Sequence, residues 1–154
     1  MQRRQFLSLS AFTAVAIIIP ASNAEDFRAT KPTVWTAHNV DDAVMAMYGT
    51  NEVIQSGVIL TIPNPAPRGS AVPVNIKSTI EAKSVALFQN ANPESAVATW
   101  TVHEGSIIDY DIKIKLKSVG EPIAVTAIVE GIDGKLYSAV STLKVAPGGC
   151  DGGA

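Results

Sequence analysis

The residue in this sequence best suited to covalent chemistry is Cys150, the only cysteine of the chain. Asp151 follows it directly, and glycines flank the two on both sides, at Gly148, Gly149, Gly152 and Gly153. Because glycine has no Cβ, it adopts positive and negative φ about equally, so residues 147–154 are predicted to form a flexible carboxyl-terminal arm. An active site instead needs rigid neighbours around its reacting group. The sequence therefore predicts a thiol that is carried into the pocket of another protein.

The arm does not activate its own thiol. A free cysteine has a pKa of about 8.5, so only a few per cent is thiolate at neutral pH. The Asp151 carboxylate is expected to disfavour the thiolate slightly by like-charge repulsion. At about 3.3–3.6 Å per residue, the sulfur of Cys150 can project roughly 10 Å beyond Pro147. Two alternatives stay open on the residues alone: an incidental terminal cysteine, or one that forms a disulfide with another chain.

The rest of the chain offers no familiar catalytic motif. The sequence has no glycine-rich phosphate loop, no His-Glu-x-x-His, no Cys-x-x-Cys and no Gly-x-Ser-x-Gly. We therefore expect a non-catalytic body with no metal site and no cofactor. The alternative is a periplasmic metal-handling or ligand-binding β-sandwich that uses imidazole and thioether groups. Its candidate ligands are His38, Met45, Met47 and His103.

Composition limits the remaining classes of function. The 154 residues suit one domain, and 47% hydrophobic with 17% charged residues is typical of a globular protein with a core. The formal net charge is −2. A chain without basic excess is not expected to bind nucleic acid.

The amino terminus has the pattern of an export signal. Arg3 and Arg4 precede an apolar run over 9–19, and small residues end the segment at Ala24. The run is shorter than the ~20 residues that span a bilayer. We therefore predict a twin-arginine signal peptide over 1–24 and a mature periplasmic protein without a membrane anchor.

An amino-terminal segment, 25–56, is expected to hold one short helix. Residues 25–37 are predicted to be a loose entry, because Lys31-Pro32 opposes a regular helix. Asn39 then resembles an N-cap, apolar residues recur at helical spacing up to Tyr48, and Gly49 ends the helix.

From residue 57 to 146 the pattern changes to alternation, which predicts an all-β domain. Residues 108–116 alternate almost perfectly, and 131–134 have the composition of a hairpin turn. Pro73 favours an edge or a bulge for its strand. About seven short strands predict an antiparallel β-sandwich of immunoglobulin-like type. The expected strands are 58–62, 72–76, 84–89, 96–103, 108–116, 123–129 and 135–145.

Several motifs resemble the SoxY family, the carrier subunit of the periplasmic thiosulfate-oxidising system. The resemblance lies in the segment 131–139, in 145–150 with its final Gly-Gly-Cys, in 71–74 and in Asn92-Pro93. Together these cover most of the predicted mature chain, and the terminal motif is the specific one. The twin-arginine signal is also typical of the family.

The resemblance implies a function and a set of partners. Cys150 would be loaded covalently with thiosulfate by a c-type cytochrome complex, and the bound sulfur would be held as a persulfide. Hydrolase and dehydrogenase components would then remove sulfate and oxidise that sulfur while it stays attached. The carrier would pair as a heterodimer with a SoxZ-like β-sandwich subunit, which would cover sheet edges that are otherwise open.

Two departures from the family pattern stand out. Asp151 replaces the glycine that usually follows the cysteine, so a carboxylate lies next to the sulfur. The segment 66–70 also lacks the Ala-Glu-Asn-Gly expected there. Loading efficiency or partner choice is therefore expected to differ from that of typical members.

Overall fold

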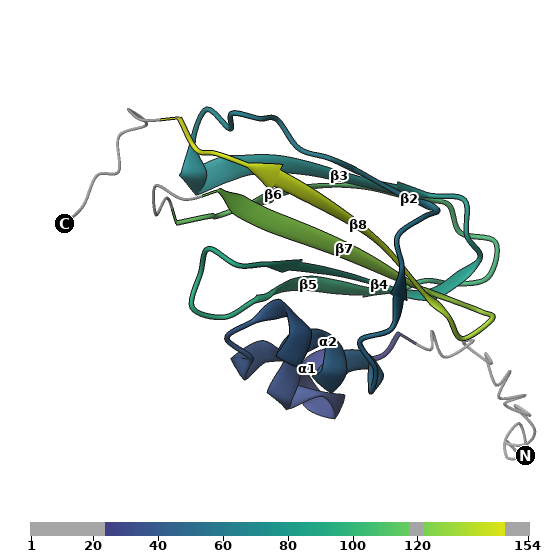
Figure 1. Cartoon of the computed structure of the whole chain (residues 1–154). Coiled ribbons are helices and arrows are strands. Elements are labelled where there is room, and N and C mark those ends of the chain that lie inside the picture. The colour runs from purple at the N-terminus through teal and green to yellow at the C-terminus, as the bar shows by residue number, and fades with distance from the viewer. Residues whose placement is uncertain (1–23, 118–121, 147–154) are drawn as a thin grey trace, which may run out of the picture.

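Two β-sheets pack face to face, and short helices cover the outer face of the larger sheet (Figure 1). The computed structural model describes residues 24–117 and 122–146. The helical elements are α1 (Phe27–Thr30), η1 (Pro32–Thr36), α2 (Val40–Tyr48) and η2 (Gly69–Ala71). The strands are β1 (Val53–Ile54), β2 (Val58–Thr61), β3 (Val72–Ser78), β4 (Ala82–Gln89), β5 (Ala96–Thr101), β6 (Ile108–Ile114), β7 (Ile123–Gly131) and β8 (Leu136–Leu143). The predicted β-sandwich is confirmed.

The sheets are of unequal size. The larger has the order β1-β8-β7-β4-β5 and the smaller has the order β2-β3-β6. Each pair is antiparallel except β1 with β8, which is parallel. Strand β5 is an edge of the larger sheet, and the next strand in the chain, β6, is an edge of the smaller sheet. Trp100 of β5 packs against Tyr110 of β6, with 5.2 Å between the ring centroids.

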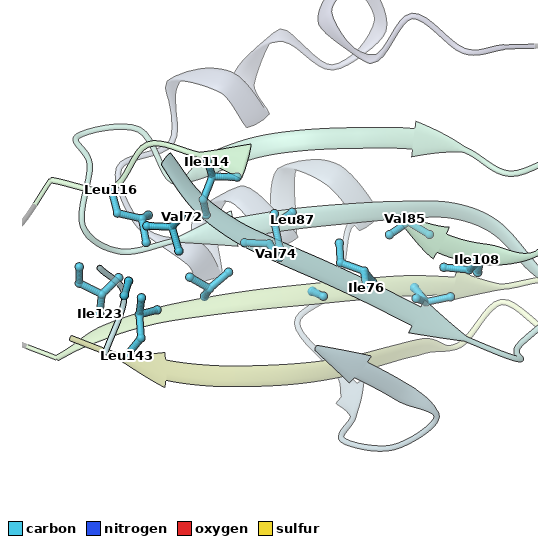
Figure 2. Close-up of a cluster of buried hydrophobic side chains, with 14 of the residues drawn as sticks. Val72, Val74, Ile76, Val85, Leu87, Ile108, Ile114, Leu116, Ile123 and Leu143 are labelled. Atoms are coloured by element: carbon cyan, nitrogen blue, oxygen red, sulfur yellow. The ribbon is translucent and has the colours of Figure 1, made fainter. Parts of the chain in front are cut away.

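A hydrophobic core fills the space between the two sheets (Figure 2). On β6, every second residue points into this core while Asp109, Asp111 and Lys113 face solvent, as the alternation predicts. Strand β4 has no such alternation because both of its faces are covered. Val85 and Leu87 face the smaller sheet, whereas Ala86 and Phe88 face the helices.

The helical layer is larger than the sequence suggested. The expectation of a loose segment over 25–37 with a single short helix after it was wrong, since α1 and η1 precede α2. Asp26 caps α1 by accepting hydrogen bonds from the backbone of Arg28 and Ala29, and Pro32 occupies the first position of η1, where its missing N–H costs nothing. The predicted helix is confirmed, with Asn39 as N-cap and Gly49 in the left-handed conformation at φ 75°.

Two strand predictions also needed correction. The described residues form eight strands rather than seven, because β1 adds a short parallel pair with β8 that alternation over two residues cannot reveal. Pro73 lies in the central strand of the smaller sheet rather than at an edge. Strand β2 pairs only with residues 75–78 of β3, so the β2 side of β3 is unpaired at Pro73, and this end of the strand has an edge of the kind in which proline is found.

Candidate functional site: the root of the carboxyl-terminal arm

The backbone that leads into the arm is fixed to the body by a short parallel bridge. Ala66 donates its N–H to the carbonyl of Lys144 at 2.8 Å, and Ala146 donates to the carbonyl of Ala66 at 2.9 Å. Ala66 is fully buried and belongs to the main core. The chain is therefore held up to Ala146, the last described residue before the predicted arm.

At Gly69, the segment 115–117 packs against the backbone beside this bridge. Its carbonyl accepts a hydrogen bond from the N–H of Leu116 at 2.8 Å. A Cβ at Gly69 would lie 2.5 Å from the Leu116 carbonyl oxygen and 3.6 Å from Cγ1 of Val145. Only glycine permits this approach of backbone to backbone. Residues 64–70, 115–117 and 144–146 thus form one cluster, which we call the arm root.

Two asparagine side chains bond further backbone groups at the arm root and beside it. Asn64 donates to the carbonyl of Thr142 at 3.2 Å and accepts from the N–H of Lys144 at 3.1 Å. Asn92, in the β4–β5 turn, donates to the carbonyl of Lys115 at 2.8 Å and accepts from the N–H of Lys117 at 3.0 Å. Each amide replaces a strand partner, so backbone groups beyond the sheets stay satisfied.

The β4–β5 turn that carries Asn92 is itself held by a buried amide. Gln89 is fully buried, donates to the carbonyl of Glu94 at 2.7 Å, and accepts from the N–H of Asn92 at 2.7 Å. A buried amide with its hydrogen bonds made rigidifies its surroundings, whereas one left unpaired costs about 1–3 kcal/mol. The turn is therefore a firm support for the segment 115–117.

A polar network outside the arm root joins the helices to the sheet. Ser84 of β4 donates to Oε2 of Glu130 at 2.9 Å, and its hydroxyl lies 3.5 Å from that of Tyr48 on α2. Burial raises the pKa of Tyr48, so the phenol stays protonated and can keep donating. This network fixes α2 on the larger sheet.

The residues of the alternative metal hypothesis do not come together. The ring Nδ1 of His38 lies 2.9 Å from the carbonyl of Pro93, whereas His103 is exposed in the loop after β5, at the opposite end of that strand. Met47 is buried against the larger sheet, and Met45 is 47% exposed on another face of α2. Within residues 24–117 and 122–146, no group of three or more His, Cys, Asp or Glu side chains could hold a metal ion.

The predicted attachment site lies outside the described residues. This applies to Cys150, to Asp151 and to the glycines of the arm, as well as to the signal peptide except for its last residue, Ala24. Sequence reasoning missed the arm root, because Asn64 and Asn92 have the composition of turns and nothing in the pattern pairs 66–70 with 115–117. Among the helices of the described residues, none is long and apolar enough to cross a membrane.

Fold and site together define a class of protein: a β-sandwich with a helical layer on one face and a chain that hydrogen bonds hold up to Ala146, beyond the last strand. Solved structures of other proteins share the fold. Superoxide reductase (neelaredoxin) from Ignicoccus hospitalis matches with a TM-score of 0.50 and 14% identity over 59% of this chain and 81% of its own. At that identity the likeness concerns the fold alone.

The family follows from the sequence match. The family model described as sulfur oxidation protein SoxY matches residues 44–150, and the chain belongs to the SoxY family. The sulfur carrier protein SoxY from Chlorobium limicola f thiosulfatophilum is similar in structure, with a TM-score of 0.60 and 26% identity over 77% of this chain and 95% of its own. No curated protein matches the sequence. Membership in the family places the chain in sulfur oxidation, with the components of that system as its partners.

Proposed function

We propose that this protein carries sulfur intermediates of thiosulfate oxidation as covalent adducts of Cys150. The observation that carries the proposal is that the SoxY match ends at residue 150, the position of the only cysteine in the chain. The similar protein from Chlorobium is itself described as a sulfur carrier. Because Cys150 is the only cysteine of the chain and lies in the predicted arm, we assign the chemistry to the arm and to the enzymes that receive it.

The loading step is an oxidation that forms a disulfide-type bond. The sulfur of Cys150 bonds to the outer sulfur of thiosulfate, the thiol loses its proton, and two electrons pass to the c-type cytochrome complex. Water then attacks the sulfonate sulfur, the bond between the two thiosulfate-derived sulfurs breaks, and sulfate leaves with one proton. Cys150 retains a persulfide, which the dehydrogenase component oxidises further. The carrier holds no cofactor in either step.

The arm root is consistent with a body that holds the arm while partner enzymes carry out the reactions at Cys150. An arm that enters several enzymes needs a fixed origin, and hydrogen bonds hold the chain up to Ala146. We assign 147–154 to the arm, 57–146 to the sandwich and 25–56 to the helical segment. A signal peptide over 1–24 would export the protein to the periplasm by the twin-arginine route.

A SoxZ-like β-sandwich subunit is the proposed stable partner. Edge strands present unpaired N–H and C=O groups that a second β-protein can cover. Strands β5 and β6 are edges of the two sheets, joined by the loop 102–107. Purified alone, the chain should therefore self-associate, and a monomer at high concentration in sedimentation velocity would count against the proposed partner.

A genetic substitution tests the proposed attachment site. Cys150→Ser keeps the size of the side chain and removes the thiolate, so a strain that carries it should lose thiosulfate oxidation. His103→Ala, at the end of the sandwich remote from the arm root, is the matched control and should retain it. Thiosulfate oxidation at the normal rate with Cys150→Ser would rule out the proposal. Loss with His103→Ala alone would favour the metal-handling alternative.

A further inference from the structure

The surface around the arm root is positively charged without any acidic residue in its own segments. Residues 62–76, 112–117 and 138–146 contain no Asp or Glu. They contain five basic side chains, all exposed, which we call the basic collar: Arg68, Lys113, Lys115, Lys117 and Lys144. The neighbouring β4–β5 turn adds one exposed acid, Glu94.

The same hydrogen bonds that build the arm root hold the collar in place. The backbone of Lys144 bonds to Ala66, and the backbones of Lys115 and Lys117 bond to the side chain of Asn92. Among the described residues, one pair of oppositely charged side chains lies within 4.0 Å, Lys77 with Asp109. No collar residue forms such a pair with another described residue. Within the described residues, these five charges are open to a partner.

The opposite end of the sandwich has the opposite character. Its exposed acids include Glu81 in the β3–β4 turn, Glu104 in the β5–β6 loop and Asp133 in the β7–β8 turn. In these turns and the two strand residues on either side of them, the basic residues are Lys77, Lys83 and Lys135, and Asp109 and Glu130 add to the acids. The protein thus has a charge asymmetry along its long axis, although its formal net charge is −2.

A groove lies beside the collar, lined by residues of β3 and β6 and by the segment 61–63 at the end of β2. It has a volume of about 500 Å³ and a mostly apolar lining that includes Pro63, Pro73 and Ile112. Lys113 belongs to both the groove and the collar, while Asp111 lines the groove and accepts a hydrogen bond from Asn75 at 2.9 Å. Cations beside apolar surface suit a protein partner, since such surface adds burial to electrostatic attraction.

The collar could attract either a protein partner or a small anion that reacts at the thiol, and the distance from the collar to the thiol distinguishes these two roles. Cys150 is four residues beyond Ala146, so an extended arm places its sulfur roughly 13–14 Å from the arm root. The Debye length at physiological ionic strength is about 8 Å, which screens the collar at that range. An enzyme that encloses the arm brings the mouth of its channel directly onto the collar. Screening there is weak because the charges are in contact.

We propose that the basic collar is the docking surface for the enzymes that receive the arm, and that their channel mouths carry an acidic rim. The inference rests on the proposed function, because it requires an arm that is enclosed by a partner. Complementary charges at the rim would speed encounter and align the arm with the channel. Charge reversal in the collar should therefore slow association and leave the bound reaction unchanged.

The test is the ionic-strength dependence of loading by the c-type cytochrome complex. Lys115→Glu with Lys117→Glu should lower kcat/KM at least about tenfold at low salt with kcat nearly unchanged, and the loss should shrink below about twofold near 0.5 M salt. The matched control, Lys83→Glu with Lys135→Glu, reverses the same number of charges at the opposite end. The kcat/KM of this control should stay within about twofold of that of the unmodified protein at every salt concentration.

A partner-free measurement separates protein docking from attraction of small anions. Alkylation of Cys150 by anionic iodoacetate, relative to neutral iodoacetamide, should change by less than about twofold in the collar variant. An equal loss of kcat/KM in the control pair, or no loss in the collar pair, would overturn the inference. So would an iodoacetate ratio that falls as much as kcat/KM. Cys150→Ser, tested alongside, reports separately on the carrier function.

Discussion

Gly69→Ala is the substitution that most directly perturbs the arm root. The new Cβ would lie 2.5 Å from the carbonyl oxygen of Leu116, which is a backbone atom and cannot rotate away. The segments 66–70 and 115–117 must therefore separate. This movement weakens the hydrogen bond from Leu116 N–H to Gly69, now 2.8 Å long, and loosens the contact with Val145.

The expected cost follows from these contacts. Overpacking of this kind costs about 1–3 kcal/mol, and a lost backbone hydrogen bond falls within the same range. At about 4 °C per kcal/mol for a chain of this size, the melting temperature should fall by about 4–12 °C. Gly69 has no positive φ that an alanine would strain, so the cost is steric.

The assay combines urea denaturation, followed by tryptophan fluorescence, with amide hydrogen exchange. The N–H groups of Leu116 and Ala146 should lose protection in Gly69→Ala more than the amides of β4 and β7, because the opening is local. Ser70→Ala is the matched control, since Ser70 is exposed and lies in the same turn. Neutral surface substitutions change the free energy of unfolding by less than about 0.5 kcal/mol. If the free energy of unfolding of Gly69→Ala lies within that margin of the unmodified protein, and the amides of Leu116 and Ala146 keep their protection from exchange, the arm root is not a rigid anchor.

Three further predictions concern the body and the arm. Phe88→Ala should cost about 3–5 kcal/mol in urea titrations, because Phe88 is fully buried between sheet and helices, whereas Val140→Ala, at 55% exposure, should cost under about 0.5 kcal/mol. Hydrogen bonds from Asn75 and then Lys77 lower the pKa of Asp109, so the contribution of this carboxylate to stability is present above about pH 4 and is lost as the pH falls further. The difference in melting temperature between Asn75→Ala and the unmodified protein should therefore shrink below about pH 4. A difference that stays constant down to about pH 2 would contradict this. Asp151→Gly should raise the rate of iodoacetamide alkylation of Cys150 at pH 7, since the thiolate loses a like-charged neighbour, and an unchanged rate would show that the carboxylate does not act on the sulfur.

Alternation predicted the sandwich because it reports directly on which face of a strand is buried. Strand β6 is the clearest case, with solvent on one face and the core on the other. The same rule fails for β4, where core and helices cover both faces, although its apolar composition still marked it as a strand. It also fails for β1, which is too short to show a period.

The helical layer and the arm root depend on contacts that sequence patterns do not encode. Asp26 caps a helix of a single turn, so α1 has no apolar periodicity to detect. Asn92 has the composition of a turn, and its bonds to Lys115 and Lys117 arise only when the fold brings distant segments together. The proposed chemistry, by contrast, follows from one residue, because a single cysteine between glycine pairs needs no tertiary contact to be noticed.

Mass spectrometry of the carboxyl-terminal peptide is the most direct test of the carrier function. The peptide that contains Cys150 should be isolated under non-reducing conditions from cells grown with thiosulfate and from cells grown without it. We expect a bound thiosulfate or persulfide on Cys150 in the first culture only, and its release by a thiol reductant. A peptide that carries a free thiol in both cultures would contradict the proposed carrier function.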